Sequence, residues 1–222
     1  MAQVIRYAFA PVHAPFADSL ALPRTLEPAR AAGAVALTFD DGPHPAGTPR
    51  VLDVLASHGA RATFFVIGEQ VVRRPELVRE IVEQGHAVQL HGHRHRLQLR
   101  LTARELRDDI ERGTAAIEDA LGASPGRHRP PYGIYSSAGL EIVRTRELRP
   151  LLWARWGKDW RKFTTPGRIA RRVLSGLRAG DVILLHDADF YSAKRSHERT
   201  AQALELIITE LRSRELDTVR AL

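Results

Sequence analysis

Short apolar runs recur along the chain, and most of them stop at a glycine, a proline or a charged residue. AVALTF, ATFFVI and DVILLH are three examples, and runs of this length and composition are typical of buried strands. The polar segment RHR is compatible with a further short strand. We expect strands at 34–39, 62–67, 86–90, 127–129, 150–155, 181–186 and 217–221.

The segments between these runs carry apolar residues at spacings of three and four, which predicts helices with one buried face. A proline near the start of 74–85 and a glycine at its end are typical helix boundaries. Thr102 stands where it can cap the long segment that follows it. Helices are expected at 48–59, 74–85, 101–122, 136–146, 165–180 and 196–214.

Alternation of strands and helices indicates parallel strands joined by crossover helices. Both a (β/α) barrel and a doubly wound open sheet satisfy this pattern, and in both the chemistry gathers at the carboxyl ends of the strands. We find no internal repeat and no Gly/Ser linker within 34–222, so we expect one domain there. Residues 1–33 have weak periodicity and several prolines, and are predicted to form an N-terminal extension with a short helix.

Composition narrows the class of protein. With 222 residues and 44% hydrophobic residues, the chain can bury a large core, and the absence of cysteine excludes a disulfide framework and thiolate chemistry. The net charge of +7 raises the possibility of a polyanionic partner. The basic residues are, however, interspersed with acids, which is typical of solvated helix faces. A nucleic-acid binder needs a basic stripe with exposed aromatic residues, so we expect no nucleic-acid partner.

Membrane and targeting signals are weak. No stretch of about 18 apolar residues occurs, so no transmembrane helix is expected. The first 20 residues lack the apolar centre of a signal peptide. We therefore expect a protein that is either cytoplasmic or exported by means of a leader that this sequence does not include.

Four predicted strands end in polar groups. Because parallel strands have their carboxyl ends at one edge of the sheet, we expect these groups to meet on one face. They are Asp40-Asp41 after 34–39, the histidines of LHGHRHR after 86–90, the segment RHRPPYG at 127–133, and His186 at the end of 181–186 with Asp187 after it.

Asp41, His91 and His95 form a candidate metal site. Two histidines four residues apart can reach one ion, and one aspartate with two histidines leaves a coordination position open, as in catalytic sites. Zn²⁺ suits these ligands, and Co²⁺, Mn²⁺, Fe²⁺ or Ni²⁺ could also bind. Asp40 would then remain available as a general base on a water whose pKa the cation lowers. The alternatives are ordinary polar loop histidines and an Asp-Asp-Gly turn.

Five motifs, in this order, resemble those of the polysaccharide deacetylase family, also called carbohydrate esterase family 4 or the NodB-homology domain. They are TFDDGPH at 38–44, HGHRH at 91–95, RHRPPYG at 127–133, KDW at 158–160 and LLH at 184–186. The resemblance covers about 34–221, so 34–222 is identified as a member of this domain family. It implies a single-domain α/β fold, a distorted (β/α)7-8 barrel of the TIM type.

The resemblance also implies a role for individual residues. It implies Asp40 as catalytic base, oriented by Arg129, and His186 as general acid, tuned by Asp159. It implies Asp41, His91 and His95 as ligands of one divalent metal. It implies that the backbone N–H of Tyr132 stabilises the oxyanion and that Pro130 contacts the substrate. It also implies that Leu184 lines the pocket for the acetyl group and that Trp160 forms a wall of the same pocket.

Two positions depart from the family pattern. Gly92 stands where a Ser or Thr often follows the first histidine, and Trp156 stands where an Asp often precedes the Asp-Trp pair. Neither departure removes a proposed ligand, acid or base, but both bear on substrate preference. Trp153, Trp156 and Trp160 are either sugar-stacking residues or core residues.

We therefore expect a metal-dependent hydrolase that removes acetyl groups, above all N-acetyl groups, from a carbohydrate such as a chitin oligosaccharide or peptidoglycan. The expected partner is an acetylated carbohydrate, and the sequence carries no signal for oligomeric state. The alternative is a non-catalytic, metal-holding carbohydrate-binding relative of the deacetylases. A phosphatase of the haloacid dehalogenase type is disfavoured, because Gly42 occupies the position of its required acid.

Overall fold

The computed structural model describes residues 22–222, so most of the expected N-terminal extension lies outside the described residues. Eight strands of the described residues form one sheet in the order β5-β4-β3-β2-β1-β7-β6, with β8 paired to β1. Every pairing between these strands is parallel. The strands are β1 (Ala34–Asp40), β2 (Ala62–Val66), β3 (Ala87–Leu90), β4 (Arg127–His128), β5 (Arg149–Pro150), β6 (Arg155–Trp156), β7 (Val182–His186) and β8 (Asp217–Thr218).

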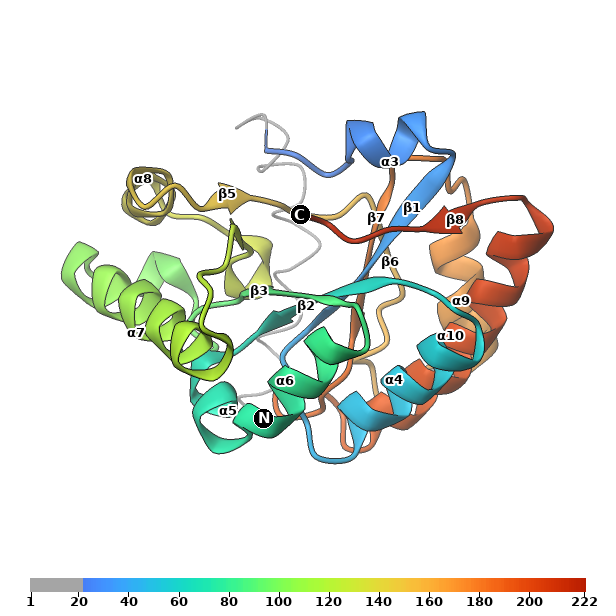
Figure 1. Cartoon of the computed structure of the whole chain (residues 1–222), viewed down its shortest axis with the longest axis horizontal. Helices are drawn as coiled ribbons and strands as arrows, with labels where there is room; N and C mark the ends of the chain where they lie inside the picture. Colours follow the sequence, from blue (N-terminus) through green and yellow to red (C-terminus); the bar gives the residue numbers. More distant parts are fainter. Residues whose placement is uncertain (1–21) are drawn as a thin grey trace.

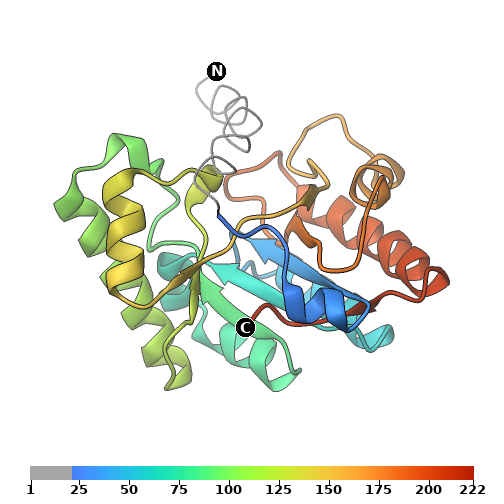
Figure 2. The same cartoon turned by 90° about the horizontal axis from the view of Figure 1, so that it is seen from above.

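Helices surround the curled sheet. In Figure 1, α4, α9 and α10 lie to the right of the central strands and α5, α7 and α8 to the left, and Figure 2 shows the same two groups from above. Neighbouring helices pack on one another within each group, α10 against α9 and α4, and α7 against α5 and α8. The helices are α3 (Glu27–Ala31), α4 (Gly47–Ser57), α5 (Gly68–Arg73), α6 (Pro75–Glu83), α7 (Ala103–Leu121), α8 (Ser137–Thr145), α9 (Pro166–Leu174) and α10 (Ser196–Ser213), with 3₁₀ turns η1 (Gln98–Arg100) and η2 (Pro131–Gly133).

The sequence pattern and the burial agree in the central strands. Every residue of β1, β2 and β3 is buried, which is expected for parallel strands covered on both faces. The structure confirms the predicted distorted (β/α) barrel in a single domain and excludes a doubly wound open sheet. Six of the predicted strands are present, most of them within one or two residues of the expected bounds; those at 127–129 and 217–221 are shorter.

The barrel is distorted because its two edge strands do not meet. Among the described strands, β5 and β6 end the sheet order without pairing to each other. Residues just before α3 contact two other segments: the Leu152 N–H, after β5, donates to the Pro23 carbonyl (2.8 Å), and the Leu26 N–H donates to the Gly180 carbonyl (2.8 Å), before β7. Irregular backbone thus links the segment after β5 to the residues that precede β7.

The prediction of a single strand at 150–155 is wrong. The structure has two short strands there, β5 and β6, which lie at opposite edges of the sheet. The chain between them crosses from one edge to the other and is buried, with Leu151 and Leu152 at 0% and 2% exposure. Burial alone accounts for the apolar run PLLWA, because residues that cross a core need the same side chains as residues that pair in a sheet.

Helix α5 was absent from the predicted elements, whereas the cap on α7 is confirmed. The Thr102 hydroxyl accepts a hydrogen bond from the Glu105 N–H (3.3 Å), and the Glu105 carboxylate accepts one from the Thr102 N–H (2.8 Å). This reciprocal pair satisfies two backbone donors that the helix leaves without partners. No helix among residues 22–222 is long and apolar enough to cross a membrane.

We expect Thr102→Ala to lower the free energy of unfolding by about 1 kcal/mol, because the variant loses the cap acceptor. Urea-induced unfolding followed by circular dichroism measures this change. Thr209→Ala is the matched control: Thr209 is exposed on α10 and its hydroxyl donates to the Glu205 carbonyl within the helix. The control should lose no stability, since alanine has the higher helix propensity. Equal stability of the two variants would contradict the role of the cap.

Candidate active site

The carboxyl ends of the central strands meet on one face of the barrel. Asp40, the last residue of β1, is in register with Phe65 on β2 and with His186, the last residue of β7. His91 directly follows β3, and Arg129 directly follows β4. The structure therefore brings together the four polar groups that the sequence pattern placed at strand ends.

Asp41, His91 and His95 converge on one point. The Oδ1 of Asp41 lies 3.6 Å from Nε2 of His91 and 3.4 Å from Nε2 of His95. One ligand atom from each of the three residues lies within 4.8 Å of the others. The side chains of Asp41 and His91 are only 3% exposed, so the cluster is shielded from bulk water.

The protonation of this cluster fits a divalent cation. His91 donates its Nδ1–H to the Arg129 carbonyl (2.8 Å), which leaves the Nε2 lone pair directed at the cluster. Burial lowers the pKa of His91 to about 3, so the ring is neutral. Burial raises the pKa of Asp41 to about 7, and its Oδ1 has no hydrogen-bond partner among the described residues. A buried carboxylate oxygen that faces the imidazoles of His91 and His95 matches the donor set of a zinc-type site.

Asp40 is held by a buried arginine. Nη1 of Arg129 donates to Oδ1 of Asp40 (2.7 Å), and Arg129 itself is 0% exposed. The same guanidinium donates to the Thr38 hydroxyl and to backbone carbonyls, and it lies 3.9 Å from the centre of the Phe65 ring. Burial raises the pKa of Asp40 above its ordinary value, and the Arg129 charge opposes part of this rise.

His186 is paired with Asp159 on the opposite side of the site. Nδ1 of His186 lies 3.0 Å from Oδ1 of Asp159, and the His186 N–H donates to the second carboxylate oxygen (2.7 Å). Thr200 on α10 donates to the same carboxylate (2.8 Å), and Asp159 is 0% exposed. Burial favours the neutral ring, but Asp159 outweighs it, with smaller contributions from Asp41 and Asp40, and the pKa of His186 rises to about 9.

A small cavity of about 40 Å³ lies between these groups. A volume of this size has room for a water or a small acyl group. Its lining is Asp40, Asp41, His91, His95, Tyr132, Gly133, Trp153, Trp156, Trp160, Leu184 and His186. Of the predicted site residues in the described part of the chain, Arg129, Asp159 and Pro130 do not line it. Arg129 hydrogen-bonds to Asp40 and Asp159 pairs with His186, and both of these partners line the cavity. Pro130 is buried just before η2.

The backbone around the cavity is unusual. Asp41 and Tyr132 have φ of +82° and +65°, a region that residues other than glycine rarely adopt. Gly92 has φ of +95°, which explains why glycine rather than a residue with a Cβ follows the first histidine here. At Gly42 a Cβ would come within 2.3 Å of Oδ2 of Asp187, so only glycine lets the first motif pack against the chain after β7.

The three tryptophans meet at the cavity rather than being separated into core and surface. The ring of Trp156 lies 6.0 Å from that of Trp153 and 5.3 Å from that of Trp160, between centroids. Trp160 packs edge-on against the His186 ring. Trp153 and Trp160 are 8% and 7% exposed and also line the cavity, so both are packed residues at the site, while stacking on a sugar stays a prediction.

A second cluster, His44, Asp189 and His197, also has its ligand atoms within 4.8 Å of one another, but it does not suit a metal. Nδ1 of His44 accepts hydrogen bonds from the N–H groups of Ala46 (3.2 Å) and Gly47 (2.9 Å). The neutral ring therefore carries its proton on Nε2, which lies 3.2 Å from Oδ1 of Asp189. A metal ligand needs that lone pair free, so this cluster is a hydrogen-bonded support for the surrounding loops.

Sequence reasoning assigned no role to the loop 187–195, which joins β7 to α10. Thr48 of α4 hydrogen-bonds to Asp187, and the Tyr191 ring stacks on the His95 ring with 4.3 Å between centroids. Burial raises the pKa of Asp187 to about 7. The only sequence signal for these residues was the position of Asp187 directly after His186.

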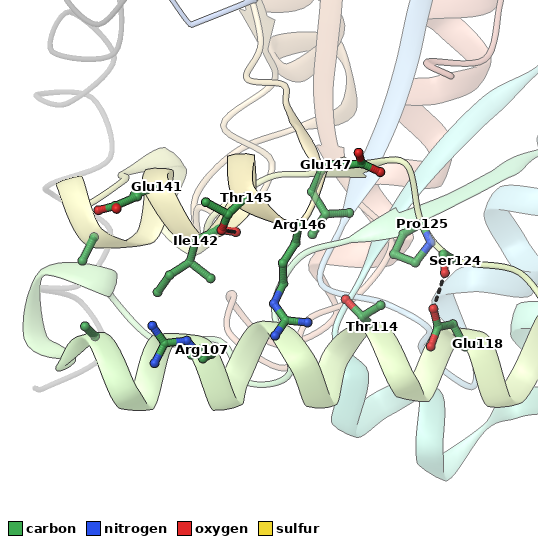
Figure 3. Close-up of a pocket in the computed structure, with 13 residues that line it drawn as sticks. Arg107, Thr114, Glu118, Ser124, Pro125, Glu141, Ile142, Thr145, Arg146 and Glu147 are labelled. Carbon is green, nitrogen blue, oxygen red and sulfur yellow. Dashed lines mark hydrogen bonds between the residues drawn. The ribbon is translucent and has the colours of Figure 1, made fainter.

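A larger cavity, of about 710 Å³, lies between α7 and α8 and shares no lining residue with the cavity at the strand ends. Figure 3 shows Arg107, Thr114 and Glu118 of α7 opposite Ile142 and Thr145 of α8, with Ser124 hydrogen-bonded to Glu118. Its lining in the described part of the chain contains no histidine. The groups that could bind a metal and transfer protons are those at the strand ends.

Comparison with known proteins gives one family. The family described as Polysaccharide deacetylase matches residues 28–151. The chitooligosaccharide deacetylase of Bradyrhizobium sp. (strain ANU 289) is 39% identical over 81% of this chain and 85% of that protein. The peptidoglycan-N-acetylglucosamine deacetylase PgdA of Listeria monocytogenes is 34% identical over 83% of this chain, which spans only 37% of that longer protein.

Solved structures agree with this assignment. The Bc1960 peptidoglycan N-acetylglucosamine deacetylase superimposes with a TM-score of 0.80 and 30% identity, covering 85% of this chain and 86% of that one. BA3943 of Bacillus anthracis, described as a pseudoenzyme of carbohydrate esterase family 4, superimposes with a TM-score of 0.76 and 25% identity, covering 85% of this chain and 64% of that one. The same fold therefore occurs in catalytic and non-catalytic proteins.

We expect Asp159→Asn to lower the pKa of His186 from about 9 by ~1–3, because the variant removes the carboxylate that most favours the imidazolium. Histidine side-chain NMR titration of the chelator-treated protein measures this pKa. Asp181→Asn is the control, because the buried Asp181 pairs with Arg155 and not with His186. An unchanged His186 pKa in Asp159→Asn would refute the pairing.

Proposed function

The chain belongs to the polysaccharide deacetylase family, and on this premise we propose that it is a metal-dependent hydrolase that removes N-acetyl groups from a carbohydrate. The observation that carries the proposal is the Asp41–His91–His95 cluster beside Asp40 and His186 at one small cavity. Its relatives are deacetylases of chitooligosaccharides and of peptidoglycan N-acetylglucosamine. The proposed substrate is accordingly an oligosaccharide or polysaccharide that contains N-acetylated amino sugars.

Asp41, His91 and His95 are proposed to hold one divalent cation, for which Zn²⁺ is the first choice because of the mixed carboxylate and imidazole donors. When bound, the cation supplies Lewis-acid polarisation of the acetyl carbonyl and lowers the pKa of a water towards neutrality. The neutral His91 ring and the partnerless Oδ1 of Asp41 support this assignment.

Asp40 is proposed as the general base. Arg129 holds Oδ1 of Asp40, so Oδ2 is the oxygen available to take a proton from the attacking water. The Arg129 charge and a neighbouring cation both favour the ionised carboxylate against the effect of burial. The backbone N–H of Tyr132 is proposed to donate to the oxygen of the acetyl group as negative charge develops on it.

His186 is proposed as the general acid. When the carbon–nitrogen bond breaks, the hydroxyl from water stays on the acetyl carbon to give acetate, and the leaving amine must take up a proton. Nδ1 of His186 is engaged by Asp159, so Nε2 is the nitrogen that can deliver this proton. A pKa of about 9 keeps the ring protonated at neutral pH, as a general acid requires. Leu184 and Trp160 are proposed to enclose the acetyl group, with Pro130 supporting the turn at Tyr132.

A second candidate, a non-catalytic carbohydrate-binding protein, is favoured by one observation: a relative of the same fold is described as a pseudoenzyme. Acetate release from chitin oligosaccharides, peptidoglycan and acetylated xylan, assayed with added zinc or cobalt, separates the two. Release from an amino-sugar polymer supports the deacetylase. Binding without any release would favour the second candidate.

We expect Asp40→Asn to lower the rate of acetate release by at least ~100-fold, because the amide cannot accept the proton of the attacking water. Zinc content by elemental analysis should stay at the wild-type level, since Asp40 is not a proposed ligand. Asp53→Asn on the exposed face of α4 is the matched control and should keep full activity. An active Asp40→Asn variant would refute the base assignment.

We expect His91→Ala to lose bound zinc, because the neutral Nε2 of His91 is one of three proposed ligand atoms. Elemental analysis after dialysis against dilute zinc measures the stoichiometry. His58→Ala, which changes the histidine that follows α4 and pairs with Glu205 of α10, should retain zinc. Stoichiometric zinc in His91→Ala would remove His91 from the ligand set.

A further inference from the structure

The two histidines of the proposed metal site are held in different ways. The His91 ring is fixed by its hydrogen bond to the Arg129 carbonyl. The His95 ring lies between two tyrosines: Tyr191 is stacked on it, with 4.3 Å between centroids and 14° between planes, and Tyr132 meets it edge-on at 4.6 Å. These two aromatic contacts therefore constrain the plane of the His95 ring.

Tyr191 is itself held at its far end. Its hydroxyl donates to Oε1 of Glu69 (3.0 Å), which lies in the first turn of α5 and 122 residues away in the sequence. A ring that is stacked on one side and hydrogen-bonded at its tip has little freedom to rotate. Tyr191 is also absent from the cavity lining in the described part of the chain, so it contacts His95 from outside the substrate space.

The loop that carries Tyr191 is anchored on both sides of it. The Asp189 carboxylate accepts a hydrogen bond from the Arg195 N–H (2.6 Å) and lies 3.2 Å from Nε2 of His44. The Phe190 ring packs on the His44 ring at 4.8 Å, with the Arg74 guanidinium 5.5 Å from its centre. The cluster that does not suit a metal thus has a clear function: it holds the loop 187–195 against the first motif.

We propose that Tyr191 is a positioning residue for the metal site: it stacks on His95 and holds Nε2 of that ring towards Asp41. The inference rests on the proposed function, because it concerns a ligand of the proposed metal. An imidazole that is already oriented loses less conformational freedom when it binds an ion, so the affinity rises. Removing the stacked ring would let the His95 side chain rotate and would expose it to water.

The test measures zinc affinity by competition with a chromogenic chelator in the full chain. Tyr191→Leu keeps much of the volume but removes the aromatic face, and Tyr191→Ala removes both. We expect each to bind zinc ~10-fold or more weakly, the range known for residues that orient metal ligands. Tyr191→Phe keeps the stacked ring and should stay within about threefold of wild type. The absorption spectrum of the Co²⁺-loaded protein should change in Tyr191→Leu and not in Tyr191→Phe.

The matched control is Phe163→Ala, which removes an aromatic ring that is 84% exposed, and its zinc affinity should equal that of wild type. Circular dichroism of the metal-free proteins shows whether each variant folds. If Tyr191→Ala fails to fold, the zinc affinity of Tyr191→Leu still decides the test. Wild-type affinity in Tyr191→Leu would overturn the role of Tyr191 and leave the metal site intact. A wild-type protein that binds no zinc would overturn the metal site and this inference together.

Discussion

The rest of the site depends on one buried side chain, the guanidinium of Arg129. Its charge is 0% exposed, and removing a charge from water is costly unless it is paired and fully hydrogen-bonded. Here it binds the Asp40 carboxylate and the Thr38 hydroxyl of β1, and the carbonyls of Leu151 and Leu152 in the segment that crosses between β5 and β6. Its own backbone carbonyl receives the His91 Nδ1–H. One residue therefore links the proposed base, a proposed ligand and the irregular part of the barrel.

This arrangement sets the electrostatics of the cavity. Asp40, Asp41, Asp159 and Asp187 are all buried near one another, and Arg129 and His186 are the positive groups that the described residues set against them. The excess of acids is part of the reason that the pKa values of Asp41 and Asp187 rise to about 7. Adding one divalent cation at Asp41 would relieve this excess, so the charge balance and the ligand geometry support the same proposal.

The loop 187–195 shows how the site is supported from outside. Its residues contact His44 of the first motif and His95 of the proposed metal site. The loop also contacts the fourth motif, where the Ala193 N–H donates to the Trp160 carbonyl (3.0 Å). A loop with contacts of this kind can change the properties of the site without changing any motif residue. Such contacts outside the motifs are relevant to activity, because the same fold also occurs in a protein described as a pseudoenzyme.

The sequence by itself determined the elements whose signals are local. The central strands were predictable because residues buried on both faces must be apolar, and the start of α7 because its capping residues lie three positions apart. The proposed ligands and proton-transfer groups were found because each stands at the end of a predicted strand or in a short motif. Only the tertiary structure divided 150–155 into β5 and β6 and placed Tyr191 on His95. Those features are contacts between segments far apart in the chain, and no spacing within one segment encodes them.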